Sequence, residues 1–440
     1  MARSRGTDGA GLNEELIKLL EQLRWSRRGF AHRVHARCQA IGLPHTVSPS
    51  TVSRWCKNET TPSGPLAAAA CHVLSGALRH RVTPESLGWP ADPSDIATDS
   101  LEYTDLPHAV RMLSRLWELD SVPDRSLVKN TFLPGVFGPA SREALVMPAD
   151  ADLAGRGTNK ATAADIELIE DQTQLYGRLD AQHGGGKFRS VFAAFLATHT
   201  TPLLNGSFSA KAGRRLYGSV ADAALAMASM AYDDHLPGLA QRYDLQAMRL
   251  AQAIGDRDRI TRVHIHQARL AAAQGDRREV LTHARSAVLA CDGASSLVKA
   301  YAAITEARAW AFNQSPQRTE WAVGRARETF DRARQGSGVD WLSWFDRHEL
   351  EGQAAWAFAV AGMAEAGTKA WEEAQDMPAE RKRDRVELLI TGAWLARLRG
   401  DEAQHVELAQ RAAEQARHLI SRRLTLRIKR LTSGQPLDEF

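Results

Sequence analysis

Hydrophobic positions in the first ninety residues recur at helical spacing, in four short segments separated by turn residues. In the second segment Phe30, Val34 and Cys38 face inward. Ser48 followed by Pro49 is typical of a helix start, because serine caps free N–H groups and proline fits the first helical position. The predicted helices are Asn13–Arg24, a helix capped by Ser26 that runs to about Ile41, Ser48–Trp55 and Leu66–Leu78, before a small turn over Thr83–Trp89.

From about Gly213 onward the pattern becomes a series of helix pairs, with alanines at many contact positions. Neither helix of a pair can bury its apolar face alone, so the pairs are expected to stack into a right-handed solenoid. The turns within pairs are predicted at Gly238, Gly275, Asn313, Gly362 and Gly400, at spacings of 37, 38, 49 and 38 residues. The inward positions are predicted to include Ile260, Val263, Ala268, Ala271, Val280, Ala284, Ala287, Cys291, Val386, Leu389, Ile390, Ala393, Val406, Ala409, Ala413 and Ala416. These spacings exceed the ~34 residues of a regular tetratricopeptide repeat. An ordinary helical bundle is the alternative.

Good helix formers dominate the whole chain and alternating strand patterns are scarce, so the predicted fold class is all-α. We expect a helical head over residues 1–89 and a repeat domain over residues 161–433. Residues 90–160 are richer in Pro, Gly, Asp and Ser and are interpreted as a linker plus a poorly defined segment, with one helix near Ala109–Leu119. A helix over Ala163–Ala181 is expected to stop at Gly184-Gly185-Gly186.

Charge is unevenly distributed between these parts. Residues 1–90 hold twelve Lys/Arg against six Asp/Glu, whereas residues 91–124 hold two against eight. A basic head followed by an acidic strip indicates a polyanion-binding surface that the linker does not share. Chance variation in surface charge is the alternative.

The composition excludes several classes of protein. At 44% hydrophobic and 25% charged residues, the 440-residue chain is typical of a globular protein with several domains. It contains no run of ~18–20 apolar residues that would span a membrane, and its first eleven residues are polar. Four cysteines do not form a disulfide framework. We expect a cytoplasmic protein, associated with the nucleoid if it binds DNA.

The short third helix carries the candidate chemistry. Val52, Trp55 and Cys56 fall on the side that packs inward. The opposite side offers small hydroxyls that permit close approach to bases, and an arginine that can bond guanine bidentately. The residues on that side are Ser50, Thr51, Ser53, Arg54 and Lys57.

Basic residues of the second helix are candidates for phosphate contacts. Arg27 and Arg28 begin this helix, where positive charge and free N–H groups both suit a phosphate. Arg24, Arg33 and Arg37 extend the same basic surface. The expected partner is double-stranded DNA, bound by a homodimer, because one short helix makes too few base contacts for genome-scale specificity.

Several segments across most of the chain match one known family: Thr51–Trp55 followed by Pro62, Val82–Gly88, Arg178–Gly186, Tyr232-Asp233, Gly238–Tyr243, Ala247–Ala251, Trp341–Asp346 and Arg381–Arg430. Through these segments the chain resembles the XRE-type regulators of actinobacteria that carry a C-terminal tetratricopeptide-like domain. The resemblance implies a helix-turn-helix transcription regulator whose repeat domain dimerises or senses a signal. One departure is that 21 residues separate Ala31 from Val52, roughly twice the spacing of a tight turn.

Other chemical sites are not favoured. His32, His35 and Cys38 lie at i, i+3 and i+6 of one helix, an arc too wide for three zinc ligands. His183–Lys187 lacks the preceding strand and the following Gly-Lys-Ser/Thr of a phosphate loop. Because no nucleophile–base–acid set is present either, we predict neither catalysis nor a cofactor or metal.

Seven of the eleven tryptophans lie between Trp310 and Trp394, in the repeat region. Aromatic side chains on the inner curve of a solenoid can bind a peptide or a small effector, although a packing role is the alternative. The candidate groove residues are Trp341, Trp344, Phe345, Arg347 and Trp356. The basic, amphipathic tail Ser421–Arg430 is either a capping helix, a dimer contact or a further DNA contact. A second class of function therefore stays open: a scaffold that binds a partner protein or peptide, with an auxiliary DNA-binding head.

Overall fold

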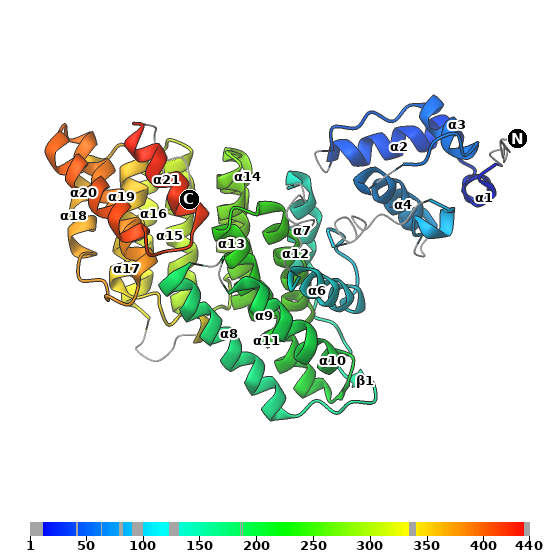
Figure 1. Cartoon of the computed structure of the whole chain (residues 1–440), viewed down its shortest axis with the longest axis horizontal. Coiled ribbons are helices and arrows are strands. Elements are labelled where there is room, and N and C mark those ends of the chain that lie inside the picture. The colour runs from blue at the N-terminus through cyan, green and yellow to red at the C-terminus, as the bar shows by residue number, and fades with distance from the viewer. Residues whose placement is uncertain are drawn as a thin grey trace, which may run out of the picture. The chain divides into compact units, whose positions relative to one another are not determined.

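The computed structural model describes residues 12–40, 43–62, 64–78, 82–89, 100–122, 132–184, 186, 188–333 and 340–434. This part of the chain is mostly helical, which confirms the predicted all-α class (Figure 1). It divides into two compact units. The first comprises residues 1–102 with 133–136, and the second comprises residues 103–132 and 137–440.

The first unit is built from short helices around an aromatic core. Its elements are α1 (Glu14–Gln22), α2 (Arg27–Ala40), α3 (Pro49–Cys56), α4 (Gly64–Leu78) and the 3-10 turn η1 (Glu85–Leu87). Trp55 is the centre of the core, with its ring edge-on to those of Phe30 and Trp89 at centroid distances of 6.5 and 5.8 Å. The Asn13 side chain caps α1 and also donates from Nδ2 to the Leu87 carbonyl at 2.8 Å, which ties α1 to η1. The predicted helices of the head are thus confirmed; Ile41 lies outside the described residues.

The segment assigned from the sequence to a linker contains two helices, α6 (Leu106–Asp120) and α7 (Phe137–Val146). The helix expected near Ala109–Leu119 is confirmed as α6, but it belongs to the second unit. It packs on α9 and α12 and buries Leu113 and Trp117 completely. Asp120 accepts a hydrogen bond from Tyr243 Oη at 3.0 Å. Burial of this apolar face holds residues 103–122 in the larger unit, despite the polar composition around them.

Helix α8 (Ala163–His183) opens the repeat region and ends where the glycine run predicts. Gly184 follows with a φ of 88°, a left-handed conformation that favours glycine. Next along the chain come α9 (Arg189–Phe195), the π-helical turn η5 (Leu196–Thr200) and α10 (Thr201–Leu204). Strands β1 (Gly155–Arg156) and β2 (Ser207–Phe208) form a two-residue antiparallel ladder, with Gly155 opposite Phe208. This ladder is a small addition to the all-α prediction.

The C-terminal half consists of paired antiparallel helices. The pairs are α11 (Ala210–Asp233) with α12 (Pro237–Ala253), α13 (Arg257–Ala273) with α14 (Arg277–Ala290), α15 (Ser296–Phe312) with α16 (Pro316–Asp331), α17 (Arg347–Val360) with α18 (Ala364–Glu373), and α19 (Lys382–Leu398) with α20 (Glu402–Ala416). The 3-10 turn η6 (Asp340–Leu342) precedes α17, and α21 (Arg422–Thr432) closes the series.

Four of the five predicted turns are confirmed, at Gly275, Asn313, Gly362 and Gly400. The prediction at Gly238 is wrong, because Gly238 lies inside α12. The turn is three residues earlier, where His235 adopts a left-handed φ of 61°. Pro237 lacks an N–H and fits the first turn of a helix, so α12 begins at Pro237 and includes the glycine.

Most predicted inward positions of these helices are buried. This holds for all four positions predicted on α13, for all four on α19, and for the four on α14, of which Cys291 is the C-cap. The exception is α20, where Val406 is 43% exposed. His405 is buried instead, with Nδ1 2.8 Å from the Ala393 carbonyl oxygen. The inward face of α20 is made by His405, Leu408, Ala409 and Ala412.

The end of the repeat series returns to its beginning. Helix α8 lies obliquely across the array and packs on both α11 and α19 (Figure 1). Helix α21 packs on α19, α20 and α11, and it adds Leu424 and Leu431 to the core of the last pairs. The Ile420 amide donates to the His183 carbonyl at 2.7 Å. The tail helix therefore caps the array, as one of the three alternatives predicts. Within the described residues, no helix has the length and apolar character needed to cross a bilayer.

Candidate functional site

The first candidate site is the outer face of α3, which begins at the predicted cap. Ser48 Oγ accepts from the Thr51 amide at 3.2 Å, and the Thr51 side chain accepts from the Ser48 amide at 3.4 Å. This reciprocal cap fixes where the helix starts and therefore which residues face inward. Val52, Trp55 and Cys56 are buried, with Trp55 only 2% exposed.

The polar residues predicted to contact DNA lie on the opposite side of α3. Ser50, Arg54 and Lys57 are exposed, and Thr51 and Ser53 are partly exposed. Lys57 lies 3.6 Å from the Glu59 carboxylate, in an exposed pair of little energetic weight. In the described part of the chain the Arg54 side chain makes no hydrogen bond or ion pair, so its guanidinium is available to a ligand.

Arg27 joins the two helices of this face. Its Nη1 donates to Ser53 Oγ at 3.1 Å, from the first residue of α2 to the middle of α3. Arg28 beside it is exposed. The structure thus brings a predicted phosphate-contacting residue and a predicted base-contacting residue into direct contact.

The other arginines of α2 differ in exposure. Arg33 is exposed, donates to the Gly29 carbonyl at 2.9 Å and lies over the Trp25 ring at 4.4 Å. Arg37 is partly buried, and burial lowers the pKa of its guanidinium, although Glu102 opposes this. Arg24, just beyond α1, is exposed. The basic surface is therefore concentrated at Arg24, Arg27, Arg28 and Arg33.

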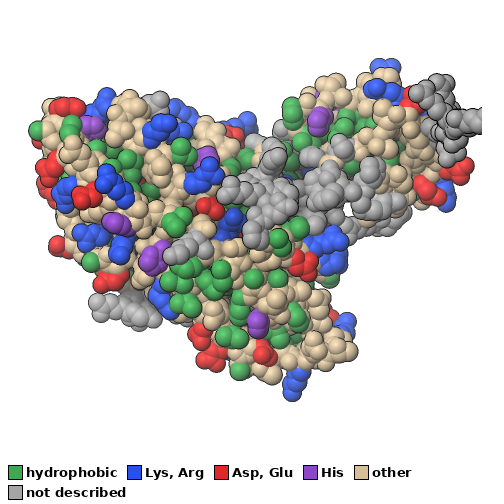
Figure 2. All heavy atoms as spheres, viewed as in Figure 1, with side chains coloured by type: hydrophobic (Ala, Val, Ile, Leu, Met, Phe, Trp, Pro, Cys, Tyr) green, Lys and Arg blue, Asp and Glu red, His purple; other side chains and the backbone are tan. Residues whose placement is uncertain are grey.

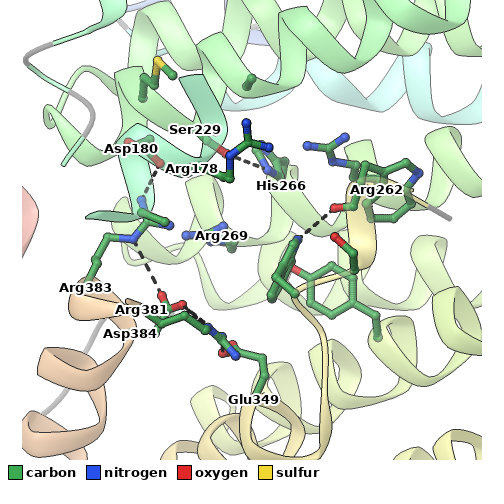
Figure 3. A pocket seen from close by; sticks show the side chains of 18 of the residues that line it. Arg178, Asp180, Ser229, Arg262, His266, Arg269, Glu349, Arg381, Arg383 and Asp384 are labelled. Atoms are coloured by element: carbon green, nitrogen blue, oxygen red, sulfur yellow. Dashed lines mark hydrogen bonds and ion pairs between the residues drawn. The ribbon is translucent and has the colours of Figure 1, made fainter. Parts of the chain in front are cut away.

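The second candidate site is a pocket of about 1260 Å³ lined by helices of the second unit (Figure 3). Its walls come from α8, α11, α13, α15, α17, α19 and α21, together with the segment that precedes α17. The first helix of every pair contributes, because the array returns on itself and those helices line its inside. A pocket of this size has room for a bound small molecule.

Arginines and carboxylates line the pocket in nearly equal number, ten and nine, and most of them form ion pairs. Arg383 meets Asp180 at 2.6 Å, and Arg262 meets Asp222 at 3.0 Å. Arg427 and Arg423 both pair with Glu387. Although burial opposes it, the charges of Arg427 and Arg423 lower the pKa of Glu387 to about 2.

Arg269 is different, because none of the described carboxylates pairs with it. It projects from α13 into the middle of the pocket (Figure 3), and its guanidinium lies 5.0 Å from the centre of the Tyr232 ring. Arg308 from α15 lies over Trp356 at 4.7 Å and donates to Gln353 at 3.4 Å. Burial, and next the charge of Arg269, lower the pKa of Arg308 to about 10.

Three of the five predicted groove residues line this pocket: Trp341, Trp344 and Trp356. Phe345 is buried beside it, with its ring 5.0 Å from that of Tyr301. Arg347 does not line the pocket; it pairs with Asp331 and Glu351 and lies over Phe330.

The pocket arginines were missed from the sequence. The ten are Arg178, Arg215, Arg259, Arg262, Arg269, Arg308, Arg381, Arg383, Arg423 and Arg427. Spacing gives a partial signal, since Arg262 and Arg269 are seven residues apart, two helical turns on one face. That signal does not show which face of a solenoid helix points inside the array.

No metal centre is formed within the described ranges, where no three His, Cys, Asp or Glu side chains are arranged to hold an ion. Cys38, Cys56, Cys71 and Cys291 are buried and form no disulfide. Burial raises the pKa of the Cys38 and Cys56 thiols, so neither is activated as a thiolate.

Comparison with known families finds one domain to which part of the chain is similar. Residues 16–90 are similar to the SP15 N-terminal domain, a match that covers the first unit from α1 to the end of η1 and includes the exposed face of α3. No curated protein and no solved structure matches the chain.

Proposed function

We propose that the protein is a sequence-specific DNA-binding transcription regulator, in which α2 and α3 form a helix-turn-helix and α3 enters the major groove. The observation that carries the proposal is the division of α3 into a sealed side with Trp55 and an open side with Arg54, Ser53 and Ser50. A recognition helix needs this division, because its inner face must hold it rigidly while its outer face approaches base edges. The lengthened connection between α2 and α3 sets this head apart from compact helix-turn-helix proteins.

The arginines at the start of α2 support the same orientation. Arg27 and Arg28 are exposed beside the open face of α3, so they would meet the sugar-phosphate backbone when α3 lies in the groove. Phosphate contacts of this kind position a protein on DNA and make its affinity depend on salt.

A homodimer supplies the second reading helix, because α3 has only eight residues and one copy makes few base contacts. The second unit has an apolar surface suited to joining two copies. Exposed apolar side chains gather over α8 and α9 (Figure 2): Leu168, Leu175 and Val191 are 42%, 38% and 55% exposed. The two helices are adjacent, since the rings of Tyr176 and Phe192 stack at 4.7 Å. We assign the contact between copies to this surface.

The paired helices of the second unit are interpreted as an irregular tetratricopeptide-like solenoid, as the resemblance to the XRE-type regulators implies. A protein of this kind would work at the nucleoid, in the cytoplasm. A gel-shift experiment with DNA from upstream of the protein's own gene tests the proposal. Retention that survives excess nonspecific DNA supports it, whereas binding that unrelated DNA and modest salt abolish contradicts it.

A second function is favoured by the pocket in the second unit. A scaffold that binds a partner peptide or protein would use the aromatic-lined space around Trp341 and Trp356, with the head as an auxiliary module. Salt-labile, nonspecific retention in the same gel shift would favour this scaffold over the regulator.

A further inference from the structure

We propose that the pocket in the second unit binds a small organic anion with a flat apolar body, whose anionic group is held by Arg269 and Arg308. The site does not depend on DNA binding by the first unit, because every residue that lines it belongs to the second. Arg269 and Arg308 line the pocket, whereas Arg347, the charged groove residue predicted from the sequence, does not.

Ion pairs join distant parts of the chain around the pocket, with Arg383 on α19 against Asp180 on α8 and Arg423 on α21 against Asp233 on α11. The second of these pairs is almost fully buried and 3.4 Å long. These closures keep the cavity walls together without a ligand, so the site is largely pre-formed, as small-molecule sites generally are.

Most arginines of the pocket face carboxylates: Arg215 faces Glu170, Arg259 faces Asp222 and Asp256, and Arg381 faces Glu349. Arg269, which projects into the middle of the pocket (Figure 3), pairs with no carboxylate among the residues that the structure describes. Arg308 donates to the neutral amide of Gln353 at 3.4 Å. The charge of Arg269 is therefore not offset by a paired carboxylate.

The nearest buried acid does not pair with Arg269. Asp244 on α12 is fully buried, and its Oδ1 lies 3.3 Å from Nδ1 of His266. Burial raises the pKa of Asp244 well above its usual value, and burial followed by the charges of Arg269 and Arg262 lowers the pKa of His266. An anion in the pocket can pair with Arg269, which no described carboxylate does.

A second arginine of the pocket wall, Arg427, also has a donor group that an anion can bind. The Nη2 group of Arg427 is buried and has no hydrogen-bond partner, while the rest of this guanidinium pairs with Glu387. A buried, charged donor without a hydrogen-bond acceptor is unfavourable, and a ligand oxygen that accepts from Nη2 would remove this cost in free energy.

The rings that line the pocket suit a ligand with a flat apolar body. Indole rings line the cavity, and two of them already support arginines, Arg262 over Trp341 and Arg308 over Trp356, each at 4.7 Å. The Tyr301 ring also lines the pocket, edge-on to Trp344 at 5.4 Å. A flat ligand body can stack against these rings while its acid group reaches the arginines. Carboxylates, sulfonates and phosphate esters share the required chemistry.

Three naphthalene probes test the site on the full-length protein by isothermal titration calorimetry. Naphthalene-1-sulfonate has the acid group, 1-naphthol is neutral and 1-naphthylmethylamine is cationic. We expect saturable one-to-one binding of the sulfonate only. No sulfonate binding, or equal binding of all three probes, would overturn the proposal without any variant.

Variants assign the charge partners. Arg269→Met and Arg308→Met keep a long side chain without its charge, and each should weaken sulfonate binding by about tenfold or more. Arg318→Met is the matched control, because Arg318 also lies over an indole ring, that of Trp310 at 4.4 Å, but is exposed and outside the pocket. It should bind the sulfonate like the wild type, and equal losses in all three variants would contradict the assignment.

Thermal unfolding separates binding from a structural role. Because Arg269 is partly buried without a carboxylate partner among the described residues, Arg269→Met should unfold at the same or a higher temperature than the wild type when no anion is present. Naphthalene-1-sulfonate should raise the unfolding temperature of the wild type and leave that of Arg269→Met nearly unchanged. A lower unfolding temperature for ligand-free Arg269→Met would show a structural role instead.

Discussion

Asp180 and Arg383 are 203 positions apart in the chain, yet the Asp180 carboxylate accepts a hydrogen bond from Arg383 Nη1 at 2.6 Å. Asp180 lies in the last turn of α8 and Arg383 in the first turn of α19, so the contact fixes the returning end of the helix series against its start. Burial alone would lower the pKa of Arg383, but the charges of Asp180 and Asp233 raise it above its ordinary value. Burial raises the pKa of Asp180, and the charge of Arg383 opposes this rise. The pair is thus a buried contact that closes the interior of the second unit.

Removing one partner of this closure should destabilise the second unit. Arg383→Ala leaves Asp180 buried without its counter-charge, and we expect the free energy of unfolding to fall by about 3–5 kcal/mol. Urea unfolding followed by circular dichroism measures the change. Arg332→Ala is the control, since Arg332 pairs with Glu328 at 2.5 Å on the exposed surface and should lose under ~1 kcal/mol. Similar losses in both variants would show that the buried pair contributes no more to the free energy of unfolding than the exposed pair does.

Arg54 is expected to read a base. Arg54→Ala should weaken binding to a preferred DNA site by about 1–3 kcal/mol and relax specificity at one base pair. Fluorescence anisotropy on the preferred site and on single-base variants of it measures both effects. Unchanged affinity and an unchanged footprint would contradict the proposal that α3 lies in the major groove.

Arg27 and Arg28 are expected to contact phosphates. Arg27→Ala and Arg28→Ala should each weaken binding to all DNA sequences alike and reduce the slope of log affinity against log salt by about 1. The measurement is a salt titration on a preferred and an unrelated site. A changed base preference in either variant would contradict the phosphate assignment.

The apolar surface over α8 and α9 is expected to join two copies. Val191→Glu places a charge in that surface and should convert a dimer to a monomer in light scattering. Val146→Glu is the control, because Val146 is 76% exposed on α7, outside α8 and α9, and should leave the dimer intact. A wild-type monomer, or dissociation by both variants, would contradict the assigned contact.

His264 on α13 is expected to make the second unit sensitive to acid. Burial, and then the charge of His283, lower the pKa of His264 from 6.5 to about 3. Between these two pH values the unfolded chain binds a proton that the folded chain does not. Stability therefore falls as the pH drops from about 6.5 towards 3, and this group has no effect above that range. The unfolding temperature of His264→Gln should decline less steeply over the same range, and an identical decline would exclude His264 as a cause.

Local signals in the sequence predict the head well. The Ser48 cap, Pro49 and the inward side of α3 follow from neighbouring residues alone, and the structure has Trp55 buried as that pattern requires. The end of α8 at Gly184 is equally local, since a left-handed residue there favours glycine.

The rest depends on contacts between distant segments. The composition of residues 90–160 does not reveal that Trp117 packs inside the second unit, because its partners on α12 are more than a hundred residues away. Val406 was assigned inward by spacing, but the bond from the neighbouring His405 to Ala393 sets the rotation of α20. The pocket arginines were missed for the same reason: their direction depends on how the array curves and closes.

Selection of bound sequences from random double-stranded DNA, performed with the full-length protein and with Arg54→Ala, addresses the central claim most directly. The wild type should enrich a two-fold symmetric motif, with half-sites separated by a whole number of helical turns, and Arg54→Ala should lose the preference at one position in each half. Failure of the wild type to enrich any motif, or enrichment of one motif by both proteins, would contradict DNA reading by α3.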